Sequence, residues 1–139
     1  MHYPIVLTPT PKHADAQNNL SSALAMKGNL EEAIPQFYAA IRYKPDYASA
    51  HSNLGNALAL KKDLPGAVRE YGACLRSNPK DAQAYNNLAN AMVEMHRIPE
   101  GIKNYEAALR LSPVNPEAHY NLGLALLQDG KREEARNHF

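Results

Sequence analysis

Apolar residues recur along this chain with the spacing of amphipathic helices. Within residues 50–58 the alanines and leucines would share one face of a helix, and the apolar residues of 67–75 follow a similar spacing. A polar break over residues 61–63 separates the two segments. The pattern predicts two short helices joined by a tight turn, each with one apolar face.

This pattern returns every 34 residues. Prolines mark the step at Pro11, Pro45, Pro79 and Pro113. A fixed step of this length is typical of a repeat protein, in which each unit buries its apolar face only by stacking on its neighbours. Further series with the same step are Ala16, Ala50, Ala84 and Ala118; Asn19, Asn53, Asn87 and Asn121; Leu20, Leu54, Leu88 and Leu122; and Phe37, Tyr71, Tyr105 and Phe139.

Residues typical of helix ends divide each unit. Asp81 and Asn115 are placed to cap first helices. Pro65 and Pro99 are expected at the first position of second helices. We expect the prolines of the 34-residue series to follow second helices and to stop them. Pro35 falls a full turn inside a second helix, where it predicts a kink or a delayed helix start.

We divide the chain into units at these signals. Residues 1–13 keep the repeat register as an irregular lead-in, interpreted as the eroded end of an earlier second helix or as an extended segment. Three units follow over 14–47, 48–81 and 82–115, and a truncated fourth covers 116–139, all in one continuous solenoid domain. We see no polar capping helix after the fourth unit. We therefore interpret the chain as part of a longer array, with end faces able to stack on a neighbour.

These series make the chain resemble the tetratricopeptide repeat family, whose unit is a 34-residue helix–turn–helix. The resemblance covers residues 14–139. The family's first-helix tryptophan position holds Gln17, His51, Tyr85 and His119 instead. The resemblance implies an all-α fold: a right-handed α-solenoid of antiparallel helix pairs, with the first helices on the inner, concave surface.

By the same resemblance, a row of polar side chains faces the concave surface. An asparagine amide carries donors and an acceptor, so such a row could bind the backbone of an extended peptide whatever its side chains. The row is similar to the asparagine ladder in the repeat region of O-GlcNAc transferase, which grips protein substrates. The alternative is that these amides bond to neighbouring helices. The candidate peptide-binding residues are Asn18, Asn19, Ser22, Asn53, Asn56, Asn86, Asn87, Asn90, Tyr120 and Asn121.

Charge and candidate chemistry narrow the function. With 15 Lys and Arg against 14 Asp and Glu, the chain lacks the basic excess typical of nucleic-acid binding. No cation stands where co-chaperone repeats clamp acidic peptide tails. No apolar run reaches the roughly 20 residues of a membrane span, and the six histidines form no metal-binding or catalytic motif. We expect no enzyme activity, no cofactor or metal, and no contact with nucleic acid or membrane.

We interpret the chain as a protein–protein interaction module that binds an extended peptide or a helix of a partner in an asparagine-lined groove. Two alternatives stay open: the substrate-recognition arm of a larger enzyme such as a glycosyltransferase, and an assembly scaffold that self-associates end to end. The lone Cys74 excludes an internal disulfide and favours a reducing, cytoplasmic compartment. We expect alanine at Asn53 and Asn87 to weaken partner binding and to leave folding nearly unchanged.

Overall fold

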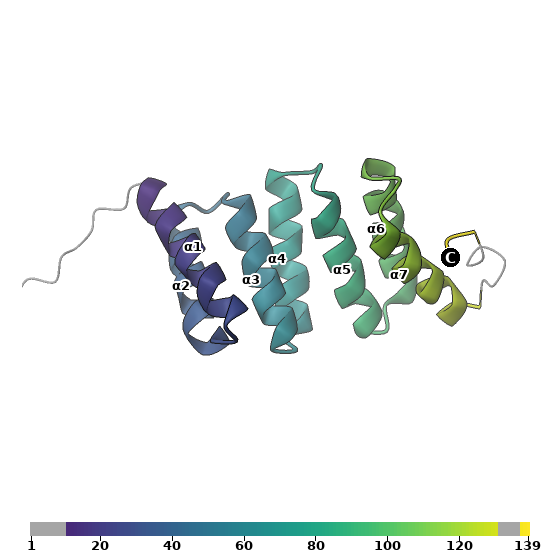
Figure 1. The fold of residues 1–139 in the computed structure, drawn as a ribbon, viewed down its shortest axis with the longest axis horizontal. Helices are drawn as coiled ribbons and strands as arrows, with labels where there is room; N and C mark the ends of the chain where they lie inside the picture. The colour runs from purple at the N-terminus through teal and green to yellow at the C-terminus, as the bar shows by residue number, and fades with distance from the viewer. Residues whose placement is uncertain (1–10, 131–136) are drawn as a thin grey trace, which may run out of the picture.

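A computed structural model describes residues 11–130 and 137–139, and this part of the chain holds seven helices connected by short turns (Figure 1). The first helices of successive units alternate with second helices. Their bounds are α1 Pro11–Met26, α2 Leu30–Tyr43, α3 Ala48–Leu60, α4 Leu64–Ser77, α5 Ala82–Glu94, α6 Ile98–Leu111 and α7 Pro116–Gln128. We keep the division into four units as a proposal.

Side-chain caps fix where several helices begin. The predicted caps are confirmed: Asp81 accepts a hydrogen bond from the Ala84 N–H at 3.0 Å, and Asn115 accepts one from the Ala118 N–H at 3.2 Å. Asp63 caps the second helix α4 in the same way. Each cap satisfies a backbone donor that has no partner inside its helix.

The turn after each first helix uses a left-handed backbone conformation. Gly28 and Gly130 have φ of 83° and 79°, and Lys62 and His96 adopt φ of 67° and 62° at the equivalent positions. Glycine takes this conformation without steric cost. The same turn forms with a side chain in two units, so the stacking of the helices imposes it whether or not glycine is present.

Four prolines differ from their predicted places. Pro11 is the first residue of α1, where a missing N–H costs nothing, and so it begins a helix. Pro65 and Pro99 are the second residues of α4 and α6, because these helices begin one residue earlier, at Leu64 and Ile98. Pro35 lies inside α2, which begins at Leu30, so the delayed helix start predicted there is wrong. Most of the lead-in predicted over residues 1–13 lies outside the described residues, and its last three residues, 11–13, belong to α1.

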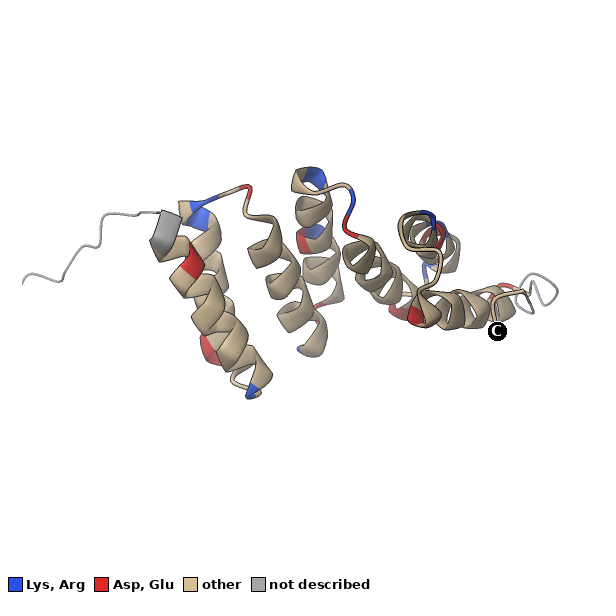
Figure 2. Ribbon diagram, turned by 45° about the horizontal axis from the view of Figure 1, so that its top comes forward, with Lys and Arg blue, Asp and Glu red and all other residues tan. Residues whose placement is uncertain are grey.

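The helices form a curved row of antiparallel pairs (Figures 1 and 2). Among the described helices, α1 contacts α3, α3 contacts α5 and α5 contacts α7, whereas α2, α4 and α6 make no contacts with one another. The first helices are therefore closer together than the second helices. The row curves toward the first helices, which line its inner surface.

The core lies between the helix pairs. Phe37 and Leu54 are fully buried, Leu122 is 1% exposed, and Tyr71 packs its ring against the backbone of Gly55. Built as an alanine, position 55 would place its Cβ 2.7 Å from the Tyr71 ring, so glycine fits this close approach and alanine would require the ring to shift. Leu20, in the same series as Leu54, is 54% exposed because no helix precedes α1 in the described part of the chain.

Candidate functional site

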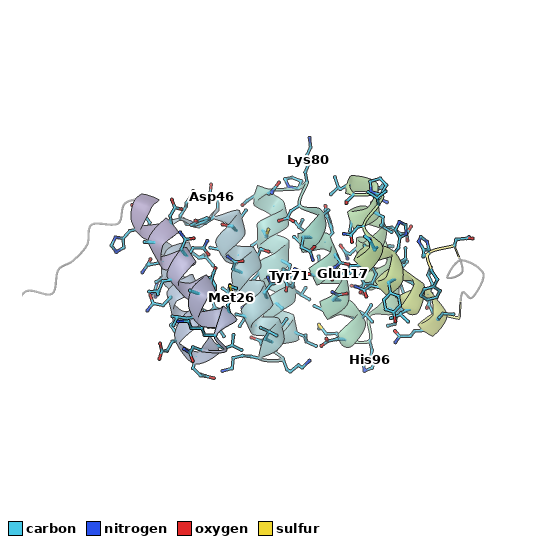
Figure 3. All side chains as sticks on the ribbon, viewed as in Figure 1. Met26, Asp46, Tyr71, Lys80, His96 and Glu117 are labelled. Atoms are coloured by element: carbon cyan, nitrogen blue, oxygen red, sulfur yellow. The ribbon has the colours of Figure 1, made fainter. Side chains whose placement is uncertain are left out.

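The predicted peptide-binding residues all lie on the first helices, and they differ in accessibility. Asn19, Asn56 and Tyr120 are exposed, and most of the others are half-buried. Two do not match the prediction of direct ligand contact. Asn18 is 5% exposed and Asn86 has no exposed surface, because both are packed between neighbouring first helices. Asn86 instead donates a hydrogen bond to Glu117 Oε1 at 3.1 Å (Glu117 is labelled in Figure 3).

Asparagine amides link each first helix to the one before it. Asn87 Nδ2 donates to Asn56 Oδ1 at 3.1 Å, and Asn121 Nδ2 donates to Asn90 Oδ1 at 3.2 Å. In the first pair of units, Asn53 Nδ2 donates to Ser22 Oγ at 3.1 Å. We call these six residues the inter-repeat ladder. The partners are always 31 residues apart, so the ladder continues with the repeat.

A tyrosine of the second helix completes two rungs of the ladder. Tyr71 donates its hydroxyl hydrogen to Asn56 Oδ1 at 2.6 Å, and Tyr105 donates to Asn90 Oδ1. Burial raises the pKa of both tyrosines above its ordinary value, so the hydroxyls remain donors under alkaline conditions. In the first unit the corresponding aromatic is Phe37, which has no hydroxyl, and there Ser22 replaces the asparagine. An asparagine acceptor is thus present where the second helix supplies a tyrosine hydroxyl, and a serine is present where it supplies phenylalanine.

The ladder amides keep hydrogen-bonding capacity for a ligand. Asn87 and Asn121 each donate one of their two Nδ2 hydrogens to the previous unit, which leaves the other hydrogen available. The Oδ1 atoms of Asn53 and Asn121 accept no hydrogen bond within the described part of the chain, while Asn87 Oδ1 accepts from Gln83 at 3.0 Å. The bonds between units restrain the orientation of these amides. A preorganised row of donors and acceptors results on the inner face.

Two depressions lie beside the ladder, one repeat apart. The first, of about 260 Å³, lies between α1 and α3, and the second, of about 530 Å³, lies between α3 and α5. Every residue that lines the first has its counterpart 34 positions later in the lining of the second. The residues of the first are Ser22, Ala25, Met26, Phe37, Asn53, Asn56, Ala57 and Leu60.

The remaining polar and reactive side chains have structural roles. His51 Nδ1 lies 2.6 Å from Glu70 Oε2, and His51 Nε2 lies 2.7 Å from the Pro45 carbonyl oxygen, so the buried ring ties α3 to α4 and to the loop before α3. Burial and the nearby Asp81 raise the pKa of the Cys74 thiol to about 11, which leaves it a poor nucleophile. Within residues 11–130 and 137–139, no three His, Cys, Asp or Glu side chains are grouped to hold a metal ion.

The ladder changes what alanine substitutions are expected to do. Asn87→Ala removes a bond between units, so we expect it to lower the free energy of unfolding by about 1 kcal/mol. Asn19 occupies the same repeat position, is exposed and makes no hydrogen bond to another described side chain, so Asn19→Ala is expected to leave stability unchanged. Urea unfolding followed by circular dichroism measures both. Equal effects would show that the amide of Asn87 is not coupled to the previous unit.

An open helical row with a polar inner face defines a helical-repeat scaffold, in which partners bind along a concave surface. The sequence profile of the TPR repeat family matches residues 22–62 and 93–130, together more than half of the chain. The chain belongs to the tetratricopeptide repeat family. A comparison with curated proteins finds no match.

Solved structures share the whole architecture. A crystal structure of MamA superposes with a TM-score of 0.89 at 24% identity, over 96% of this chain and 78% of that one. MamA from Desulfovibrio magneticus RS-1 gives 0.86 at 24% identity, over 95% and 73%. Pseudomonas aeruginosa PilF gives 0.81 at 27% identity, over 91% and 58%. The predicted right-handed α-solenoid is confirmed.

Family and fold together identify the chain as a protein-interaction scaffold. In the described part of the chain, no helix has the length and hydropathy that crossing a bilayer requires. The similarity of the asparagines to the ladder of O-GlcNAc transferase stays a prediction.

Proposed function

We propose that the inner face of the first helices holds an extended segment of a partner protein. The observation that supports this most is the row of ladder amides, which are oriented by bonds to the previous unit and keep further donors and acceptors. An extended segment has unpaired backbone N–H and C=O groups along its length, and these match such a row. Each net hydrogen bond contributes only about 1 kcal/mol, so recognition requires several repeats acting together.

A bound helix is less compatible with this surface. The backbone groups of a helix are already paired within the helix, so they cannot satisfy the amides. The proposed extended segment would contact the accessible members of the predicted site, namely Asn19, Ser22, Asn53, Asn56, Asn87, Asn90, Tyr120 and Asn121. Asn18 and Asn86 would support them from beneath.

Site-specific photo-crosslinking tests which surface is used. A photoreactive residue is placed at Asn19 or Gln83 on the first helices, or at Arg69 or Lys103 on the second helices, all of which are exposed. Each variant is illuminated with a random library of capped peptides. We expect adducts from Asn19 and Gln83 and background levels from Arg69 and Lys103. Adducts mainly from the second helices would move the binding surface to the outer face and overturn the proposal.

Exposed apolar residues on the terminal helices support end-to-end self-association as a second candidate function. Leu20 on α1 is 54% exposed, and Leu124 and Leu127 on α7 are 40% and 42% exposed. Exposed apolar side chains on the first and last described helices favour stacking on another copy. Sedimentation velocity over a concentration series tests this idea. A monomer at all concentrations would contradict it.

A further inference from the structure

Exposed apolar side chains line the two depressions on the inner face. Met26, the last residue of α1, is 89% exposed, and Leu60, the last residue of α3, is 66% exposed (Met26 is labelled in Figure 3). Leu60 lines both depressions, and Met26 lines the first. Large apolar side chains beside a hollow are a typical site for apolar groups of a ligand.

Charge contributes little to this surface. Helix α3, which lies between the two depressions, contains no Lys, Arg, Asp or Glu (Figure 2). The second depression has two charged residues, Lys62 and Glu94, and these neutralise each other with Lys62 Nζ 3.5 Å from Glu94 Oε2. A ligand segment that crosses α3 would therefore leave its own charges without partners. An uncharged segment fits best, because it loses no hydration of charged groups.

The spacing of the depressions selects a ligand conformation. They are one repeat apart, and the first helices that line them are in contact, α1 with α3 and α3 with α5. The axes of helices in contact typically lie about 8–10 Å apart. A polyproline II segment advances about 9 Å in three residues and returns its side chains to the same side at every third residue. A β-strand repeats its faces at every second residue, with steps of about 7 Å. The polyproline II step is the better match.

We propose that the groove recognises an uncharged, polyproline II-like segment with apolar side chains at positions i and i+3. One apolar side chain occupies the depression between α1 and α3, and the other occupies the depression between α3 and α5. The amides of Asn53 and Asn87 bind the backbone between them. This inference rests on the proposed function and specifies the chemical class of its ligand.

Synthetic peptides test the register directly. Capped peptides of one neutral serine and proline composition carry two leucines at i and i+3, at i and i+2, or at i and i+7, and fluorescence anisotropy measures their binding to the whole chain. Burying the second leucine is expected to tighten binding of the i, i+3 peptide about tenfold over the i, i+2 peptide. Preference for i, i+7 would indicate a bound helix, and equal binding would indicate no register; either result overturns the inference.

A matched pair of variants assigns the effect to the depressions. Leu60→Ser changes a side chain shared by both depressions, and we expect it to weaken the i, i+3 peptide about tenfold and to abolish the preference for this spacing. Leu111→Ser changes a 41% exposed leucine at the end of α6 and should leave binding unchanged. An unchanged affinity in Leu60→Ser, with the fold verified by circular dichroism, would overturn the inference.

The proposed function can stand while this inference fails. Peptides that bind equally at every leucine spacing, and that crosslink to Asn19 and Gln83, would support the inner face and contradict the register. Crosslinks confined to the second helices would contradict both.

Discussion

Leu54→Ala is expected to lower the free energy of unfolding by about 2–5 kcal/mol, the largest effect of any substitution considered for this chain. Leu54 is fully buried and packs in one core cluster with Phe37, Ala57 and Tyr71. Truncation would remove its apolar contacts and leave a cavity between the first and second pairs of helices. Urea unfolding followed by far-UV circular dichroism measures the change.

The control for this prediction comes from the same repeat position. Leu20 stands 34 residues before Leu54 and is 54% exposed, so Leu20→Ala is expected to cost less than about 1 kcal/mol. The two variants make the same chemical change, and only the surroundings differ. A cost for Leu20→Ala as large as that for Leu54→Ala would mean that another surface covers α1 in solution.

Glu70→Ala is expected to cost about 3 kcal/mol. Glu70 Oε2 is the partner of His51 Nδ1 at 2.6 Å, and both side chains are more than 90% buried. Without the carboxylate, His51 Nδ1 loses its partner inside the protein, and removing one member of a buried pair is strongly destabilising. Because His51 also bonds the Pro45 carbonyl, we expect the loop before α3 to loosen, which hydrogen exchange at the amides around it would detect.

Glu70→Gln serves as the matched comparison. Glutamine keeps the length of the side chain and can either donate to or accept from His51 Nδ1, so we expect a cost nearer 1 kcal/mol. The chain already has glutamine at the corresponding position of the first unit, Gln36. Equal costs for the alanine and glutamine variants would show that the loss of charge, and not the loss of a partner, determines stability here.

Much of the local structure could be predicted from the sequence because its causes are local. The caps at Asp81 and Asn115 depend on a side chain and the N–H three residues further along. The helix breaks follow from apolar spacing and proline. Pro35 is the exception: the sequence predicted a kink or a delayed helix start, yet α2 begins at Leu30, so the start is not delayed. Packing of Ala33 and Phe37 in the core favours the helix around the missing hydrogen bond.

The candidate site could be predicted only in part. The asparagine series is visible in the sequence, and so is its place on the first helices. The sequence does not show that Asn87 and Asn121 donate to residues 31 positions earlier, or that Tyr71 and Tyr105 share the same acceptors. These pairings depend on the angle and offset at which one helix pair stacks on the next. The two depressions depend on the same offset.

By itself, the sequence determined the repeat length, the helix pairs and the positions available for a core, because periodicity and helix-end chemistry act within about one unit. The tertiary structure decided which residues of one type have different surroundings. Leu54 is buried and its counterpart Leu20 is exposed, and among the candidate asparagines Asn86 is buried while Asn19 is exposed. Leu54 is buried because other helices pack on the side of α3 that carries it, whereas no described helix covers Leu20 on α1. The inner surface arises only when the first helices contact one another along the row. Identical residues therefore acquire different roles through stacking.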